Sequence, residues 1–188
     1  MFDNFDEDLD SFFDNSCLNL NIDSINGVKN KDEKLSVLNF NIGSLPKKFD
    51  GFLVLLGQLN FRFDIIVLTE TWLTESNRDV FKLPGYNSVH VVRPGYVRGG
   101  GVSIFYNENF NCKIVASSVT THSEFLMVSL NHSTFSCPLI VGGLYRPPKN
   151  NSQSIDEFLT FLNNLSNFKE VKPSNFLLST SDSSCNFV

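Results

Sequence analysis

The sequence is poor in cysteine, and its cysteines are not grouped. The four of them, Cys17, Cys112, Cys137 and Cys185, are far apart in the chain. No C-x-x-C pair is present, so the sequence has no signal for a zinc ribbon or for thiol-disulfide exchange. It also lacks the basic, apolar N-terminal segment that directs secretion, and no run is long and apolar enough to span a membrane. These absences predict an intracellular chain with reduced thiols and no membrane partner.

Basic residues are scarce at the start of the chain. Residues 1–33 hold nine of the 20 acidic residues and two of the 15 basic ones, which leaves residues 34–188 with 13 basic and 11 acidic residues. The formal net charge of -5 therefore describes the first segment, and it neither favours nor excludes an anionic substrate for the rest. Residues 1–33 alternate acids with Phe and Leu and have too little aliphatic content to fold alone. We predict a disordered leader, solvated or docked on a protein partner, followed by one patterned domain at 34–188.

Residues 34–70 predict a strand, a helix and a second strand. Alternation in KLSVLNFN (34–41) indicates a strand, and apolar residues recur at helical spacing through 48–60. The apolar run in IIVLTE (65–70) is typical of a strand buried on both faces. A strand-helix-strand unit implies a right-handed crossover and a parallel strand pair, and the C-terminal ends of such strands usually carry the chemistry in α/β sheets.

The rest of the chain predicts more strands and a second helix. Four strand-like runs joined by turns follow a polar loop, at 87–93, 101–106, 112–118 and 124–130. A fifth, PLIVGGLYRPP (138–148), ends in a double proline that cannot extend a ladder. Apolar spacing then predicts an amphipathic helix from Ile155 to Leu165, and an apolar strand follows at 175–178.

Two polar side chains fall at the C-terminal ends of the predicted parallel pair. Asn41 ends the first strand and Glu70 ends the second. A lone carboxylate there can cap a helix, pair with a basic residue or bind a hard cation, and asparagine is common where a strand turns. Adjacent parallel strands would bring both groups to one rim. Such a rim suits Mg²⁺, which takes one or two protein carboxylates and keeps water and phosphate as its other ligands.

The glycine run and the histidines give weaker signals. Gly99–Gly101 match neither the dinucleotide-binding nor the Walker pattern, so they predict the start of the strand that follows and not a phosphate-binding loop. His90, His122 and His132 lie in or beside strand runs with no carboxylate at metal spacing. We predict that these histidines pack in the core or at the surface.

Four motifs occur in a characteristic order: LNFNIGSL (38–45), LTETWL (68–73), RGGGVSIFY (98–106) and GLYRPP (143–148). At these separations they resemble the endonuclease/exonuclease/phosphatase family, and more narrowly the endonuclease domain that precedes reverse transcriptase in non-LTR (LINE-type) retrotransposons. The resemblance runs from about Lys34 to Leu178. It implies an α/β fold with two sheets face to face and helices outside, Mg²⁺ or Mn²⁺ as cofactor, DNA bound through its phosphate backbone and, for an active element, a nuclear location.

The resemblance implies roles for four residues. Asn41 matches the asparagine that orients the catalytic centre, and Glu70 matches the glutamate that binds the divalent metal. Tyr145 matches the tyrosine that hydrogen-bonds the scissile phosphate, and Arg146 beside it would grip phosphate. In the family a water activated by an Asp/His pair attacks, and the retrotransposon enzymes nick DNA so that the exposed 3′-hydroxyl primes reverse transcription. From the residues alone, Tyr145 could instead cover the core and Arg146 be a solvated charge.

The chain departs from the family pattern after its last predicted strand. The family shows Gly-Asp-Phe-Asn there and an Asp-His pair much later, whereas this chain reads STSDSSCNFV, with Thr180 in the place of the aspartate and Asp182 two residues late. We therefore expect an incomplete α/β/β/α sandwich with half an active site, an uncovered sheet edge, marginal stability and no nuclease activity as given. The alternatives are a non-catalytic domesticated fragment that binds a protein or phosphate, and a phosphatase acting on a small molecule or lipid.

Overall fold

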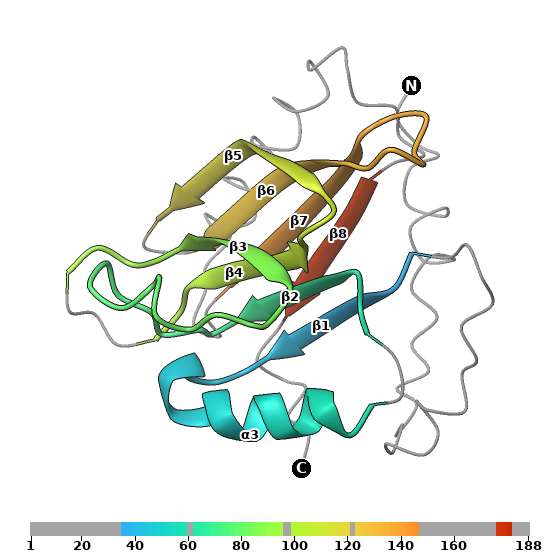
Figure 1. The fold of residues 1–188 in the computed structure, drawn as a ribbon. Coiled ribbons are helices and arrows are strands. Elements are labelled where there is room, and N and C mark those ends of the chain that lie inside the picture. The colour runs from blue at the N-terminus through green and yellow to red at the C-terminus, as the bar shows by residue number, and fades with distance from the viewer. Residues whose placement is uncertain (1–34, 60–61, 96–98, 121–122, 147–175, 182–188) are drawn as a thin grey trace, which may run out of the picture.

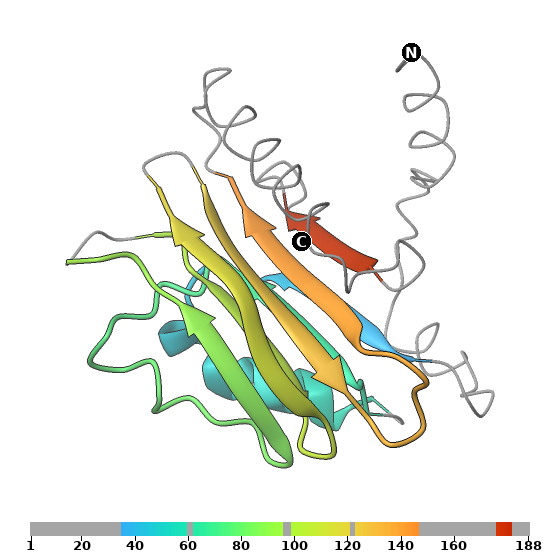
Figure 2. The same cartoon turned by 90° about the horizontal axis from the view of Figure 1, so that it is seen from above.

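The computed structural model describes residues 35–59, 62–95, 99–120 and 123–146 and the backbone of 176–181. In these residues the chain forms two four-stranded sheets packed face to face, with helix α3 (Leu45–Gly57) on the outer side of the first sheet (Figures 1 and 2). The predicted two-sheet α/β sandwich is confirmed. No helix in the described ranges is long and apolar enough to cross a membrane.

The first sheet contains the predicted parallel pair. Its strands are β1 (Val37–Asn41), β2 (Ile65–Thr69), β3 (Tyr86–Val91) and β4 (Val102–Asn107), in the spatial order β1-β2-β4-β3. β1 and β2 are parallel, and β4 is antiparallel to both of its neighbours. Helix α3 connects β1 to β2 and begins three residues before the predicted start. It does so because a proline suits the first turn of a helix and Leu45 is fully buried.

The second sheet contains the remaining described strands. These are β5 (Asn111–Val119), β6 (Glu124–Asn131), β7 (Leu139–Tyr145) and β8 (Phe176–Ser181), in that spatial order. β7 and β8 are parallel and the other pairs are antiparallel. The strand predicted at 175–178 therefore continues to Ser181. The predicted leader at 1–33 and the helix predicted from Ile155 to Leu165 lie outside the described residues.

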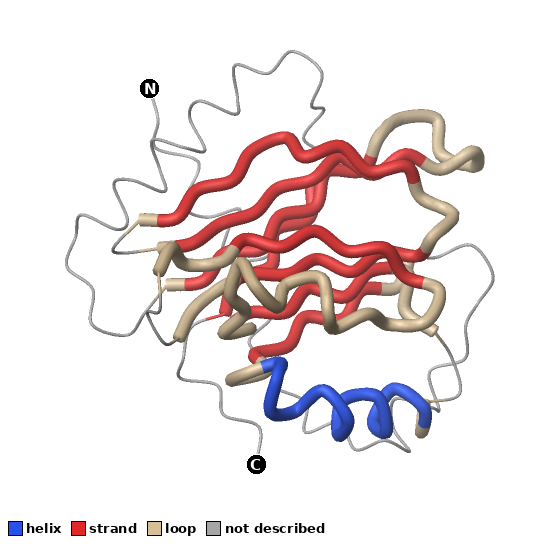
Figure 3. Tube along the Cα trace, turned by 60° about the vertical axis from the view of Figure 1, so that its left-hand side comes forward, coloured by secondary structure: helices blue, strands red, loops and turns tan. Residues whose placement is uncertain are grey.

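Strand β2 separates two hydrophobic cores, which explains its uninterrupted apolar run. All five of its residues are buried. Ile65 and Val67 face the core between the sheets, whereas Ile66 and Leu68 face the core under α3, where Figure 3 shows the helix along one side of the strands. The sheets approach so closely that a Cβ at Gly143 would lie 2.6 Å from a methyl group of Val102. Both faces of β2 are thus covered, so a polar group on this strand can reach solvent or a ligand only at its ends.

Candidate functional site

The ends of β1 and β2 meet the start of β4 at one end of the sandwich. Asn41 pairs in register with Thr69, the residue before Glu70, so Asn41 and Glu70 lie at the same rim. Backbone hydrogen bonds join the three segments: Ile42 N to Thr69 O (3.0 Å), Ser44 N to Glu70 O (2.8 Å), Thr71 N to Gly101 O (3.3 Å) and Trp72 N to Gly100 O (2.9 Å). The rim that the parallel pair predicts is therefore present and tied to the glycine run.

Glu70 is held between the two sheets. Its φ of 54° and the φ of 54° at Trp72 are both in the left-handed region, so the backbone turns sharply where β2 ends. The indole Nε1 of Trp72 donates a hydrogen bond to Oε2 of Glu70 at 2.7 Å, and the hydroxyl of Tyr145 donates to Oε1. A carboxylate has about four lone-pair positions. Each oxygen of Glu70 thus keeps acceptor capacity for a further ligand.

Tyr145 covers the core, as one of its two predicted roles requires, while its role toward phosphate stays a prediction. Its ring is buried in the core between the sheets, and its hydroxyl reaches Glu70. Burial raises the pKa of Tyr145, and the hydrogen bond to Glu70 and the charges of Glu70 and Glu124 raise it further, against a smaller opposite effect of Arg93. The phenol therefore stays protonated and acts as a hydrogen-bond donor.

Asn41 and Arg146 lie at the same end of their strands as Glu70 and Tyr145. The side-chain oxygen of Asn41 accepts a hydrogen bond from the backbone N–H of Gly43 at 3.2 Å, a contact typical of asparagine in turns. Arg146 follows the last residue of β7 and is partly buried, so it is not a fully solvated charge. The structure brings the predicted residues to one rim, and their catalytic roles stay predictions.

An ion pair beside this rim is not predicted from the sequence. Glu124, the first residue of β6, is 0% exposed, and its carboxylate pairs with Arg93, whose side chain is 19% exposed. Burial raises the pKa of Glu124, and the hydrogen bonds from Gly101 and Arg93 oppose this only in part. A signal for Glu124 does exist in the sequence, because it is a carboxylate that begins an apolar run, just as Glu70 ends one.

The glycine run binds a carboxylate of the protein itself. Gly101 N–H donates to Oε2 of Glu124 at 2.9 Å, and β4 begins at the next residue. Gly100 and Gly101 have φ values of 70° and 87°, which favour glycine. A Cβ at Gly100 would lie 2.4 Å from the Glu124 carboxylate, and one at Gly101 would lie 2.5 Å from Thr71 Oγ1. The predicted role of the run as the start of a strand is confirmed.

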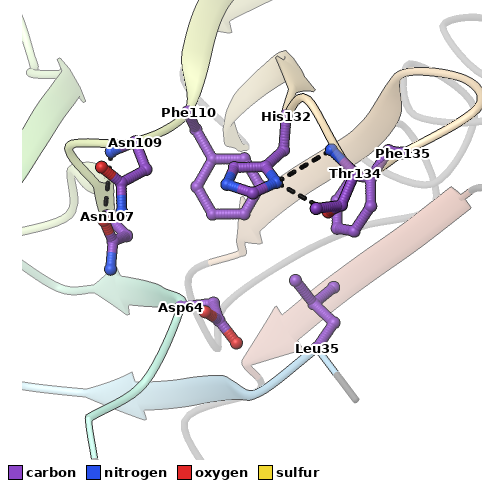
Figure 4. A pocket seen from close by; sticks show the side chains of 8 residues that line it. All are labelled: Leu35, Asp64, Asn107, Asn109, Phe110, His132, Thr134 and Phe135. Carbon is purple, nitrogen blue, oxygen red and sulfur yellow. Dashed lines mark hydrogen bonds between the residues drawn. The ribbon is translucent and has the colours of Figure 1, made fainter. Parts of the chain in front are cut away.

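A cleft of about 610 Å³ lies at the other end of the sandwich, before β1 and β2 begin (Figure 4). It is lined by Leu35, Asp64, Asn107, Asn109, Phe110, His132, Thr134 and Phe135. Asp64 Oδ2 accepts hydrogen bonds from the backbone and hydroxyl of Ser36 at 2.8 and 2.7 Å, and Asn107 accepts one from Asn109. This cleft lies away from the C-terminal ends of the parallel strands, where ligands of α/β sheets bind, so the rim at Glu70 is the better candidate site.

The described histidines pack as predicted. His132 contacts the rings of Phe110 and Phe135, with centroid distances of 5.2 and 5.7 Å, and its Nδ1 lies 2.7 Å from Thr134 Oγ1. His90 packs edge-on against Phe105 and hydrogen-bonds two serine hydroxyls. His122 lies outside the described residues.

The rim suits a hard cation better than a transition metal. The described residues include no group of three or more His, Cys, Asp and Glu side chains that could hold a metal ion. Glu70 and Asn41 offer carboxylate and amide oxygens, and Mg²⁺ needs only one or two protein carboxylates beside water and phosphate. These two residues would hold such an ion, with Glu70 as its charged ligand.

Comparison with known proteins finds solved structures with a similar fold. No sequence-family model matches the chain, and no curated protein matches it in sequence. Among solved structures it is similar to an endonuclease/exonuclease/phosphatase family protein from Bacteroides thetaiotaomicron (TM-score 0.54, 15% identity, 78% of this chain and 62% of that one). It is also similar to D. rerio TDP2 complexed with a single-strand DNA product (TM-score 0.50, 20% identity, 79% and 60%). A third is the endonuclease domain of TRAS1, a telomere-specific non-LTR retrotransposon (TM-score 0.51, 9% identity, 81% and 61%).

The arrangement of the described strands agrees with the fold of these similar structures. The chain spans 60 to 62% of the length of the three structures, and identities of 9 to 20% establish the fold and not the activity. Two face-to-face sheets, with a glutamate at the end of a central strand, are what the four sequence motifs predict. The chain has the fold of the endonuclease/exonuclease/phosphatase family, non-LTR retrotransposon endonucleases included.

Proposed function

We propose that this chain carries the metal- and phosphate-binding part of a DNA endonuclease site of the retrotransposon type. The observation that carries the proposal is the position of Glu70, whose carboxylate ends a buried strand at the rim and receives hydrogen bonds from Trp72 and Tyr145. Ligands of α/β sheets bind at this end of parallel strands. Similarity in fold to a DNA-bound TDP2 and to a retrotransposon endonuclease domain supports DNA as the substrate class.

Each residue at the rim has a separate proposed role in binding a phosphodiester. Glu70 is the proposed ligand of Mg²⁺ or Mn²⁺, with Asn41 beside it. Such an ion, when bound, supplies positive charge that stabilises the leaving oxygen. Tyr145 keeps its proton because burial and Glu70 raise its pKa. That one proton is donated to Glu70 in this structure, and we propose that it turns to a phosphate oxygen when the Glu70 carboxylate binds the ion instead. Arg146 adds a guanidinium suited to the same group.

We further propose that the chain binds DNA with little or no turnover. In β8, Thr180 pairs in register with Leu144, and Ser181 pairs with Tyr145. The resemblance puts a catalytic aspartate at the position of Thr180. A threonine hydroxyl is not ionised near neutral pH and cannot accept a proton as a general base does. The strand is present, but the residue expected to help activate water is not.

A binding and nicking experiment with the 188-residue chain tests this function. We expect a labelled duplex oligonucleotide to bind more tightly with Mg²⁺ than with EDTA, and we expect Glu70→Ala to abolish that gain. Glu75→Ala is the matched control, because Glu75 is 67% exposed and pairs with Arg78 in the following loop. Supercoiled plasmid should be nicked no faster by the wild type than by Glu70→Ala.

Three outcomes would change the proposal. DNA binding that depends on neither Mg²⁺ nor Glu70 would contradict it. Binding that survives Glu70→Ala and Asn41→Ala but disappears when residues 1–33 are deleted would favour a non-catalytic interaction module. Robust nicking that Glu70→Ala abolishes would keep the site and refute the expected inactivity.

A further inference from the structure

Glu124 links the two sheets beside the candidate site. It belongs to β6 of the second sheet, yet both oxygens of its carboxylate bind groups that flank strands of the first: Arg93 just after β3 and the N–H of Gly101 just before β4. β3 and β4 are neighbours whose ends, Val91 and Val102, pair in register. A fully buried carboxylate is costly unless it is paired. Glu124 therefore fixes the point where the glycine run enters the sheet.

The glycine run in turn fixes Trp72. The carbonyl oxygens of Gly100 and Gly101 accept hydrogen bonds from the N–H groups of Trp72 and Thr71 at 2.9 and 3.3 Å. A Cβ at Gly99 would lie 3.8 Å from Nη1 of Arg93 and 4.0 Å from Nε1 of Trp72, so the guanidinium and the indole flank this glycine. The same indole nitrogen donates to Glu70 at 2.7 Å. A chain of observed hydrogen bonds thus leads from Glu124 to Glu70.

A second path runs through the neighbouring strand. Tyr145 pairs in register with Glu124 across β6 and β7, and its hydroxyl donates to the other oxygen of Glu70. Of the two donors that orient the Glu70 carboxylate, Tyr145 thus lies next to Glu124, and Trp72 is connected to Glu124 through the glycine run. Arg93 matters for a separate reason: without its charge, the carboxylate of Glu124 would act on Glu70 as an uncompensated negative neighbour.

We propose that Arg93 and Glu124 form a positioning pair that holds the indole of Trp72 against Glu70 and so sets the geometry of the cation site. This inference rests on the proposed function of Glu70 for its consequence in cation binding. Its structural part, the placement of Trp72, is independent of any bound ion. Trp72 and Tyr145, which donate to Glu70, are one step removed from the proposed metal ligand, and replacing partners of this kind typically changes metal affinity by about 10- to 100-fold.

Trp72 is the single tryptophan of the chain, so its fluorescence reports on this pair directly. The test uses the full chain with Glu124→Gln, which keeps an oxygen for Gly101 but loses the charge that pairs with Arg93. A second variant, Arg93→Lys, keeps the positive charge but loses the guanidinium geometry. Glu108→Gln is the control, because Glu108 is exposed at the opposite end of β4. Thermal melts followed by circular dichroism verify that each variant folds.

We expect Trp72 emission to shift to the red and acrylamide quenching to rise in Glu124→Gln, with Glu108→Gln unchanged and Arg93→Lys intermediate. Titration with MgCl₂ alone, followed by the same emission, should show weaker binding in Glu124→Gln, by up to about tenfold, because the change reaches Glu70 only through Trp72 and Tyr145. Trp72 emission and quenching like the wild type in folded Glu124→Gln and Arg93→Lys would overturn the proposal. If Glu124→Gln does not fold, Arg93→Lys decides by the same readout.

The two proposals fail in different ways. Absence of Mg²⁺ binding in the wild type would defeat the proposed function, whereas the emission of the metal-free variants would still decide whether Arg93 and Glu124 position Trp72. Unchanged emission together with Mg²⁺ binding that depends on Glu70 would defeat only the positioning pair.

Discussion

Tyr145 in the second sheet donates a hydrogen bond to the carboxylate of Glu70 at the end of a strand in the first sheet. The candidate site therefore depends on both sheets, although its proposed metal ligand belongs to one of them. A change that alters the packing of the sheets should reach Glu70 through this contact. The hydroxyl of Tyr145 is the group to remove first.

Tyr145→Phe should weaken Mg²⁺-dependent DNA binding with little loss of stability. The ring stays in the core, and the change removes one hydrogen bond, which contributes about 1 kcal/mol to folding. Tyr86→Phe is the matched control, since Tyr86 also donates its hydroxyl, to the carbonyl of Phe63, but at the far end of the first sheet. Fluorescence anisotropy with labelled DNA measures the effect. Equal losses of affinity in both variants would show that the Tyr145 hydroxyl has no specific role at the site.

Local pattern predicts the strands well because burial in a two-sheet sandwich follows alternation. Ile65 and Val67 face one core and Ile66 and Leu68 the other, which is why the run has no polar residue. The strand-helix-strand pattern implies that β1 and β2 are parallel, and parallel pairing is enough to bring Asn41 and Glu70 to one rim. Tyr145 is found only through the motif resemblance, because nothing in its own strand indicates that its hydroxyl reaches across to the other sheet.

The pair of Arg93 and Glu124 could not be predicted in the same way. These residues are 31 positions apart, and their contact depends on β4 lying between β2 and β3 and on how the two sheets face each other. Neither the strand order nor the packing of the two sheets can be predicted from a short stretch of the sequence. A carboxylate at the start of an apolar run does predict that Glu124 needs a partner, but it does not identify Arg93 as that partner.

Gly143→Ala should destabilise the sandwich. The added methyl would lie 2.6 Å from Val102 Cγ1 and 2.9 Å from Val67 Cγ1, and both valines are stiff and fully buried. Overpacking of this kind typically costs about 1 to 3 kcal/mol of unfolding free energy. Gly51→Ala in α3 is the control, since no atom lies within 4 Å of its Cβ position and alanine favours a helix by up to about 1 kcal/mol. Urea unfolding should move the midpoints of the two variants in opposite directions.

The two described cysteines should differ in reactivity. Cys137 is exposed, whereas Cys112 is partly buried and burial raises the pKa of its thiol. Since the thiolate is the reactive form, iodoacetamide at about pH 8 should modify Cys137 well before Cys112. Peptide mapping by mass spectrometry follows each site, and the difference should vanish in urea. Equal rates under native conditions would show that the start of β5 is not packed as described.

His90 should make the stability of the chain depend on pH between 6.5 and 4. Burial lowers the pKa of His90, which packs against Phe105, from 6.5 to about 4; Asp79 raises the pKa by a smaller amount and Arg78 lowers it slightly further. The unfolded chain then binds more protons than the folded one in this window, so the His90 contribution is complete above pH 6.5 and is lost as the pH falls toward 4. The loss is on the order of 3 kcal/mol at the lower limit. Because carboxylates also titrate there, the measurement is the difference in urea-unfolding free energy between wild type and His90→Gln at several pH values. That difference should shrink on acidification, and a difference that stays constant would show that His90 is accessible to protons in the folded chain.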